Sequence, residues 1–284
     1  MRAEAKGQAA AFLAPAAATL TAVMLLPAAY VVWLSLERHS LVGAAPRFVG
    51  FDNYRALLTD ERFWNAFANT VYFTIVSVAI EVALGLAIAL LLVGRMRGKA
   101  ILYAVILVPW ATPTVVSARM WEWMYNADFG VLNYVLGLHA NWLGSPGLAM
   151  HAAIAMDVWK STPFVAILLL AGLQNIPREL YQAAAVDGAS GWAAFRRVTL
   201  PLLAPLIAVA LIFRTIDAFR VFDAIYVLTG GGPANSTETL SIYAYKVLFQ
   251  TLDFGYGSAL SVAVFVCVGL LTLAYARLLR RGLE

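Results

Sequence analysis

Residues 67–93 read FANTVYFTIVSVAIEVALGLAIALLLV, an apolar run in which Glu81 is the one charged side chain. A helix rises about 1.5 Å per residue, so a run of this length can cross the roughly 30 Å hydrocarbon core of a bilayer. The whole chain has the same character, because 62% of its 284 residues are hydrophobic and 13% are charged. A soluble domain carries about twice that charged share. The sequence therefore predicts an all-α protein that spans a membrane several times.

We expect six transmembrane helices in a single domain over residues 1–284. They lie near residues 11–36, 67–93, 100–124, 149–173, 201–227 and 257–279. Arg2 and Lys6 precede the first span, as in a secretory signal peptide, but the apolar stretch is too long for one and five further spans follow. We therefore expect an uncleaved first helix. The one cysteine, Cys267, falls inside the last span and gives no disulfide framework.

The basic residues between the spans fall on one side of the predicted membrane. That side receives Arg2, Lys6, Arg95, Arg97, Lys99, Arg178, Arg196, Arg197, Arg277, Arg280 and Arg281. The connections on the other side are mixed or acidic, and the second of them carries Asp128 alone. Because Lys and Arg accumulate in cytoplasmic loops, we expect both termini in the cytoplasm of a bacterial-type plasma (inner) membrane.

The connection over residues 174–200 is longer than a simple return of the chain requires. Residues 177–185 (PRELYQAAA) favour a helix opened by Pro177, residues 187–190 indicate a turn, and residues 192–200 form a second helical piece that leads to Pro201. This helix–turn–helix is too polar to enter the bilayer. The pattern alone fits either a plain connector or a segment with a function on the cytoplasmic face.

Polar residues near the midpoints of four spans lie at about the same depth. They are Glu81 in the second span, Trp110, Thr112 and Thr114 in the third, Asp157, Lys160, Ser161 and Thr162 in the fourth, and Arg214, Thr215 and Asp217 in the fifth. Each ionisable side chain near the bilayer centre costs roughly 2.5–3.5 kcal/mol, so such residues usually face a cavity or a partner. Pro109, Pro113 and Pro163 add sites where a softened helix exposes backbone groups.

Helical spacing assigns these residues to faces. One face holds Asp157, Lys160, Ser161 and Phe164, a second holds Arg214, Asp217 and Ala218, and a third holds Trp110 and Thr114. One interpretation is a set of structural salt bridges, such as Lys160 with Asp217 or Asp157 with Arg214. The other is a hydrated solute site, and both can hold together. A sugar suits the second interpretation, because its hydroxyls need many donors and acceptors and its apolar ring face can stack on Trp110 or Phe164.

The sequence lacks the motifs of several functional classes. The chain has no Walker-type phosphate loop, and Gly230-Gly231-Gly232-Pro233 indicates an extracellular turn. His39, His139 and His151 lack metal-ligand spacing, and no hydrolase or metalloprotease motif occurs. We therefore expect no catalytic residue, no metal and no cofactor on this chain, and the net charge of +4 does not by itself indicate nucleic acid.

Residues 181–203 (YQAAAVDGASGWAAFRRVTLPLL) resemble the cytoplasmic EAA motif of binding-protein-dependent ABC importer permeases. Gly188 matches the family glycine and residues 198–201 match its closing I-x-L-P element, while Gln182 stands where the family usually has glutamate. The resemblance implies that a short helix here docks in a cleft of an ATPase subunit. The implied coupling residues are Tyr181, Gln182, Ala183, Ala184, Asp187, Gly188 and Ala189.

Further blocks extend the resemblance over most of the chain, at residues 51–54 (FDNY), 69–71 (NTV), 158–164 (VWKSTPF), 171–177 (AGLQNIP), 213–223 (FRTIDAFRVFD) and 227–233 (VLTGGGP). They resemble the carbohydrate-uptake subgroup, above all the first permease of maltose, trehalose and glycerol-phosphate systems. This implies the type I ABC importer architecture. The implied sugar contacts are Trp110, Thr114, Asp157, Lys160, Ser161, Phe164, Arg214 and Ala218, to which the depth argument adds Asp217.

The resemblance also implies an assembly. The partners are a second permease in a heterodimer, two ATPase subunits that hold ATP and magnesium, and an extracytoplasmic sugar-binding protein. A gradient-driven secondary transporter that uses Asp157 or Glu81 as an ion site is the alternative, although such transporters usually have more spans built from repeats. An intramembrane enzyme is a third class, for which the sequence offers no catalytic constellation.

Overall fold

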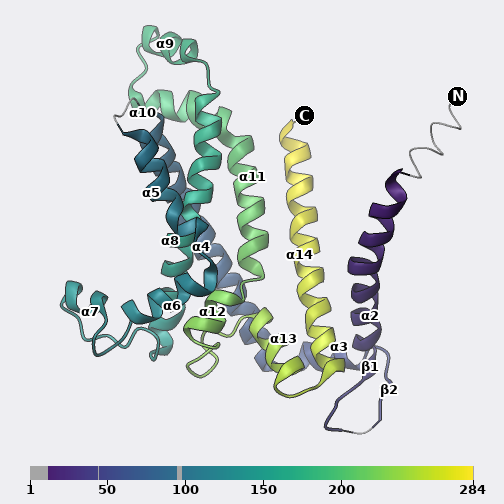
Figure 1. Cartoon of the computed structure of the whole chain (residues 1–284). Helices are drawn as coiled ribbons and strands as arrows, with labels where there is room; N and C mark the ends of the chain where they lie inside the picture. Colours follow the sequence, from purple (N-terminus) through teal and green to yellow (C-terminus); the bar gives the residue numbers. More distant parts are fainter. Residues whose placement is uncertain (1–11, 44, 95–97, 284) are drawn as a thin grey trace, which may run out of the picture. The chain divides into compact units, whose positions relative to one another are not determined.

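The computed structural model describes residues 12–43, 45–94 and 98–283 (Figure 1). Arg2, Lys6, Arg95 and Arg97, on which part of the orientation argument depends, lie outside the described residues. The described elements are η1 (Thr21–Leu25), α2 (Leu26–Ser35), β1 (Glu37–Arg38), β2 (Arg47–Phe48), α3 (Asp52–Thr59), α4 (Glu61–Val93), α5 (Lys99–Ala111), α6 (Thr114–Met124), α7 (Val131–Leu136), α8 (Pro146–Gln174), α9 (Arg178–Val186), α10 (Gly191–Ala194), η2 (Phe195–Thr199), α11 (Leu200–Phe219), α12 (Asp223–Leu228), α13 (Leu240–Phe249) and α14 (Phe254–Leu283).

Within the described part of the chain, five helices are long and apolar enough to cross a membrane: Phe12–Ser35, Glu61–Val93, Pro146–Gln174, Gly191–Phe219 and Phe254–Tyr275. The pair α5 and α6 passes the same test together, but its two helices meet at 93°. The count is therefore five, or six if the bent pair forms one span. The helical membrane class is confirmed, and the count of six stays a prediction.

The bend between α5 and α6 falls at Pro113, where the prolines of the third span predict a softened segment. Thr112, the residue before the proline, is extended (φ −76°, ψ 134°), as steric contact with the proline ring favours. Pro109 lies inside α5 without a break. The expectation that Trp110 and Thr114 share one helix face is wrong, because the two residues stand on different helices.

Two other boundaries differ from the predicted spans. The second span begins at Glu61, six residues earlier, since the polar residues at its start continue the helix. The fifth ends at Phe219 rather than at residue 227, and residues 223–228 form the separate helix α12. The carbonyl of Val221, freed at this break, accepts a hydrogen bond from the Thr239 hydroxyl at 3.2 Å. Helix α13 lies in a segment that we expected to be an outer loop.

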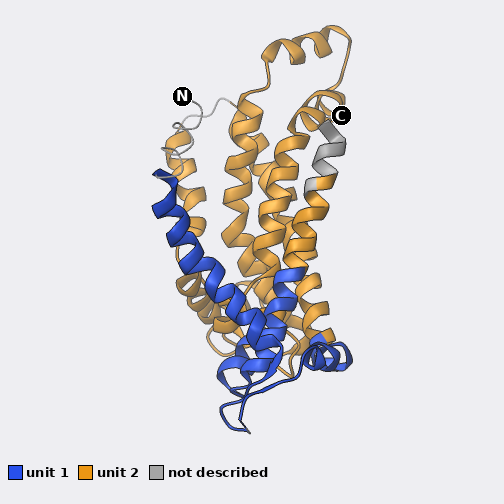
Figure 2. Ribbon diagram, turned by 90° about the vertical axis from the view of Figure 1, so that its right-hand side faces the viewer, with its two compact units in different colours: residues 1–63, 243–266 blue, residues 64–242, 267–284 orange. Residues whose placement is uncertain are grey.

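The chain divides into two compact units, one of residues 1–63 with 243–266 and the other of residues 64–242 with 267–284 (Figure 2). In the first, Asn53 Nδ2 donates to the carbonyls of Ser35 (2.9 Å) and Glu37 (2.8 Å), and the amide of Phe254 donates to the carbonyl of His39 (2.7 Å). These contacts link the end of α2 and the short strand pair to the starts of α3 and α14.

In the second unit, α8 packs against α5 and α11 (Figure 1). Gly85 on α4 allows a further close approach, because a Cβ at this position would collide with Val165 of α8. Two apolar clusters fill the unit. One contains Phe73 and Val78 of α4 with Met150, Met156 and Val158 of α8, and the other contains Ala89 and Leu92 of α4 with Val165, Leu169 and Leu173 of α8. Glu81, Lys160 and Arg214 lie between the two clusters along their helices, and Asp157 lies at the edge of the first.

The connection over 174–200 forms the expected helix–turn–helix at one end of this unit (Figure 1). Helix α9 is followed by Gly188 in the left-handed conformation (φ +75°), and the amide of Ala189 closes the turn on the carbonyl of Ala184 at 2.9 Å. Ser190 caps α10 by accepting from the amide of Ala193. The second predicted helical piece, residues 192–200, is not separate from the fifth span, because Gly191–Phe219 is one continuous helix.

Candidate substrate cavity

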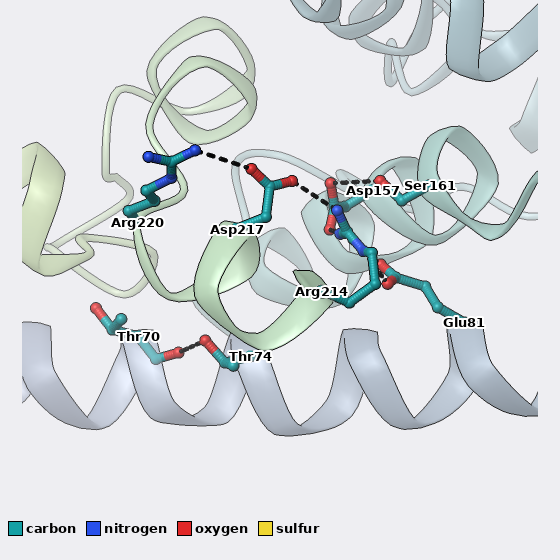
Figure 3. Close-up of polar contacts among 8 residues, drawn as sticks. All are labelled: Thr70, Thr74, Glu81, Asp157, Ser161, Arg214, Asp217 and Arg220. Atoms are coloured by element: carbon teal, nitrogen blue, oxygen red, sulfur yellow. Dashed lines mark hydrogen bonds and ion pairs between the residues drawn. The ribbon is translucent and has the colours of Figure 1, made fainter. Parts of the chain in front are cut away.

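Arg214 of α11 is the centre of a buried charge cluster (Figure 3). Its Nε and Nη2 donate to the two carboxylate oxygens of Glu81 at 2.6 and 3.0 Å. Nη2 also donates to Asp157 Oδ2 at 3.1 Å, and Nη1 donates to Asp217 Oδ2 at 2.6 Å. One guanidinium thus joins three helices, α4, α8 and α11. The expected pair of Asp157 with Arg214 is confirmed.

Burial explains why the cluster is densely paired. Glu81 is fully buried and Arg214 is 6% exposed, whereas the side chain of Asp217 is 58% exposed. A charge held away from water is tolerated only when paired and hydrogen-bonded. Glu81 therefore closes the cluster on its inner side, and Asp217 extends it outward, where Arg220 Nη2 lies 3.7 Å from Asp217 Oδ1.

Lys160 does not pair with Asp217, as one interpretation of the sequence expected. Its Nζ donates to the carbonyl of Thr112 at 2.6 Å and lies 3.5 Å from that of Trp110. In an unbroken helix the Trp110 carbonyl would accept from the amide four residues later, but the break at Pro113 removes this partner. Lys160 thus occupies backbone acceptors that the broken helix leaves open.

Asp157, Lys160, Arg214 and Asp217 line a cavity of about 270 Å³, behind which Glu81 lies. Its walls contain seven of the predicted site residues, namely Thr114, Asp157, Lys160, Ser161, Arg214, Asp217 and Ala218, together with Arg220, Val221, Phe222, Asp223 and Ala224. The structure thus gathers on one surface residues that helical spacing assigned to separate helices.

The two predicted aromatic residues lie in a second hollow, of about 350 Å³. The rings of Trp110 and Phe164 stack at 6.1 Å between centroids with an angle of 24°, and Phe213 meets Phe164 edge-on. Arg214, Asp217 and Arg220 line both hollows. The charged and the aromatic walls are therefore neighbours.

Sequence reasoning missed part of this site. Residues 220–224 line the cavity because α11 ends early, and the sequence carries no proline or glycine there that signals the break. Glu81 stood out by its depth, but its partner could not be read from the sequence. Two residues at the same depth have other surroundings: the Thr215 hydroxyl bonds the Tyr275 hydroxyl at 2.9 Å, and Thr162 is buried.

Five of the seven predicted coupling residues line a hollow of about 540 Å³ between α9 and α10. Ala183, Ala184, Asp187, Gly188 and Ala189 line it, with Leu180, Ser190, Ala193, Ala194, Arg197 and Val198. Tyr181 has a different place, because its hydroxyl bonds the Thr199 hydroxyl at 2.9 Å and ties α9 to η2. Gln182 is exposed. Among the residues that the structure describes, no group of three or more His, Cys, Asp or Glu could hold a metal ion.

Apolar spans around a cavity lined with charges, with a polar helix–turn–helix at one end, define a membrane-spanning transport permease. The family model of the binding-protein-dependent transport system inner membrane component matches residues 65–284. The chain belongs to this family, and the resemblance seen in the sequence is confirmed. Members are transport permease subunits without a catalytic site of their own, so the chain is not an enzyme.

Three relatives are similar over most of their length. The trehalose/maltose transport system permease protein MalF of Thermococcus litoralis is 47% identical over 258 residues, which cover 89% of this chain and 87% of that protein. The trehalose transport system permease protein SugA of Mycobacterium tuberculosis is 42% identical, with 94% and 86% covered. The sulfoquinovosyl glycerol transport system permease protein SmoG of Agrobacterium fabrum is 41% identical, with 94% and 89% covered.

A solved structure has the same fold. A chain of a bacterial ABC transporter involved in the import of the acidic polysaccharide alginate matches with a TM-score of 0.84 at 23% identity, and the match covers 98% of this chain and 96% of that chain. The ABC importer permease fold is therefore confirmed.

Proposed function

We propose that this chain is the permease subunit through which an ATP-driven importer moves a sugar, a disaccharide such as trehalose or maltose, across the plasma membrane. The observation that carries the proposal is the cavity of about 270 Å³, whose wall combines carboxylate, ammonium, guanidinium and hydroxyl groups between apolar clusters. The names of the relatives support a sugar but not one kind, because they include trehalose, maltose and sulfoquinovosyl glycerol.

The wall offers a sugar several kinds of contact. The exposed carboxylate of Asp217 accepts hydrogen bonds from sugar hydroxyls, and the hydroxyls of Ser161 and Thr114 both accept and donate them. The stacked rings of Trp110 and Phe164 provide an apolar surface for a pyranose face. Polar and aromatic walls that meet at Arg214 and Asp217 suit a molecule with hydroxyls on its rim and an apolar ring face.

The proposal includes an assembly and an orientation. Both termini lie in the cytoplasm, as the basic residues predict, and a second permease forms a heterodimer with this chain. The assembly holds two ATPase subunits, which carry ATP and magnesium; one of them docks at the hollow around Gly188, and an extracytoplasmic binding protein delivers the sugar. Closure of the ATPases moves α10 and α11 as one piece, because Gly191–Phe219 is continuous helix from the docking segment to Arg214. A gradient-driven transporter is not favoured, since the chain belongs to a binding-protein-dependent family.

Uptake of labelled sugar tests the function. Cells that lack the gene should lose uptake of trehalose or maltose, and the complementing gene should restore it. Unlabelled trehalose, maltose and glycerol phosphate compete in the same assay and rank the substrates. Uptake of all three at the original rate in the deletion strain contradicts the proposal, and so does uptake that continues when the ATPase partner is inactivated.

A further inference from the structure

Two of the three cationic groups of the cavity, those of Arg214 and Lys160, are already hydrogen-bonded to acceptors of the protein itself. A guanidinium has five N–H donors, and the contacts of Arg214 with Glu81, Asp157 and Asp217 use four of them. Lys160 donates to two backbone carbonyls, and Arg220 lies near Asp217. A sulfonate, phosphate or carboxylate on a substrate would have to compete with these partners.

The balance of formal charge points the same way. Four carboxylates lie in or directly behind the cavity wall, those of Glu81, Asp157, Asp217 and Asp223. Three cationic side chains face them, those of Lys160, Arg214 and Arg220. With every group at its formal charge, an anionic substrate would meet one more carboxylate than cations inside the low-dielectric span, whereas an uncharged sugar meets no such repulsion.

The position of Glu81 lets it control how much of the Arg214 charge is available in the cavity. It is fully buried, it does not line the cavity, and it takes Nε and Nη2 of Arg214 with both carboxylate oxygens. A bidentate pair of this kind is how arginine otherwise binds a carboxylate or phosphate of a ligand. Loss of the Glu81 charge would leave the cavity wall in place and free part of the guanidinium for an anion.

We propose that this cavity selects uncharged sugars over sugars that bear a sulfonate, phosphate or carboxylate group, and that Glu81 sets this selectivity by neutralising Arg214 from behind. The inference rests on the proposed function and names the substrate class of the same cavity. Glu81 is a positioning residue in this role, because it acts on the substrate through Arg214.

Equilibrium binding tests the inference on the complex of this chain with its permease and ATPase partners, purified without the binding protein. Labelled trehalose and trehalose 6-phosphate are the probes, since they differ by one phosphate. We expect the native complex to bind trehalose at least tenfold more tightly than its phosphate. Glu81→Gln should shift this ratio at least tenfold toward the phosphate, while Glu81→Asp, which keeps the charge, should not. The matched control is Glu122→Gln, because Glu122 pairs with Arg119 on α6 without lining the cavity.

Equal binding of the two probes by the native complex overturns the inference, and so does an unchanged ratio in Glu81→Gln. If the complex with Glu81→Gln does not assemble, Asp217→Asn is tested in its place. Asp217 is largely exposed, so its charge can be removed without burying an unpaired group, and it pairs with both Arg214 and Arg220. That variant should shift the ratio in the same direction, and an unchanged ratio would again overturn the inference. A native complex that binds neither probe refutes the proposed sugar site itself, a result distinct from trehalose binding without charge selectivity.

Discussion

At the scale of single residues, Arg214 explains why the cluster resists simple mutagenesis. Its removal leaves Glu81 and Asp157 buried without a cationic partner, which typically costs about 3–5 kcal/mol. Alanine at Arg214 thus loses function through misfolding alone. Substitutions that preserve volume or remove one neutral group separate binding from stability.

Ser161→Ala and Phe164→Leu are two such substitutions, and Asp157→Asn is the isosteric change of a charged wall residue. Ser161 lies in the charged wall and Phe164 stacks on Trp110. A lost neutral hydrogen bond is worth about 0.5–1.5 kcal/mol, so we expect the transport KM of Ser161→Ala to rise roughly two- to tenfold at normal complex yield. Phe164→Leu and Asp157→Asn should change KM or substrate preference. The control is Thr272→Ala, which removes an exposed hydroxyl of α14. If KM and the substrate range were unchanged in all three variants, the polar residues at this depth would be structural contacts between helices and not a sugar site.

Asp60, which directly precedes α4, carries a pH-dependent contribution to stability. Partial burial raises its pKa, but hydrogen bonds from Tyr243 (2.5 Å), Tyr256 (2.6 Å) and the amides of Arg62 and Phe63 outweigh burial, so the pKa of Asp60 lies below its usual value. The stabilisation is therefore present above the unfolded pKa, near 4, and is lost as the pH falls through the folded pKa.

Asp60→Asn should lower the free energy of unfolding at pH 7 by roughly 1.5–3 kcal/mol, the usual range for hydrogen bonds to a charged group. The difference from the native protein should shrink below about pH 4. Thermal unfolding of the purified complex at a series of pH values between 3 and 8 measures this difference in stability. Asp52→Asn is the matched control, because Asp52 pairs with Arg55 on the surface. A difference that stays constant over the whole pH range would contradict the assignment.

At the scale of elements, the turn between α9 and α10 depends on Gly188. A Cβ at this position meets open space, but φ is +75°, a conformation that costs most side chains about 1–2 kcal/mol. Gly188→Leu should therefore strain the turn and place a large side chain at the hollow of about 540 Å³. We expect an inserted permease that no longer transports and that co-purifies with less ATPase.

Gly188→Asn separates backbone strain from obstruction of the hollow. Asparagine tolerates the left-handed conformation, and its side chain is smaller and more polar than that of leucine. It should retain more transport than Gly188→Leu. Gln182→Glu should be neutral or mildly improving, because Gln182 is exposed on α9 and glutamate is the residue that the family usually has there. Full ATPase co-purification with Gly188→Leu, or with a variant that lacks the loop, would show that this segment is not the docking site.

At the scale of the whole molecule, the orientation in the membrane is open to a direct test. In a Cys267→Ala background, Val186→Cys places a thiol on α9, where the native side chain is 88% exposed. Ala234→Cys places one at Ala234, an exposed residue in the loop that follows the glycine run. A membrane-impermeant thiol reagent should label residue 234 in intact cells and residue 186 only after the membrane is opened. The reverse pattern would invert the predicted topology.

Local sequence determined much of this protein. Apolar run lengths indicated the spans, because a helix in hydrocarbon must be long and apolar whatever it packs against. The depth of Glu81, Asp157, Lys160 and Arg214 followed from their place in each run. The helix–turn–helix around Gly188 also followed, since proline, glycine and helix-forming residues act on the backbone over a few positions.

Only the tertiary structure decided how these parts meet. Glu81 and Arg214 are 133 residues apart, and their bidentate contact depends on the rotation of two helices about their axes, which hydropathy does not encode. The sequence marked Pro113 as a weak point, but the 93° bend and the reach of Lys160 to the Thr112 carbonyl depend on the packing of α5 against α8. Just after the early end of α11, the Val221 carbonyl likewise accepts from Thr239, a residue later in the chain. Each outcome is a contact between segments far apart in the chain, so local propensity could place the residues but not their partners.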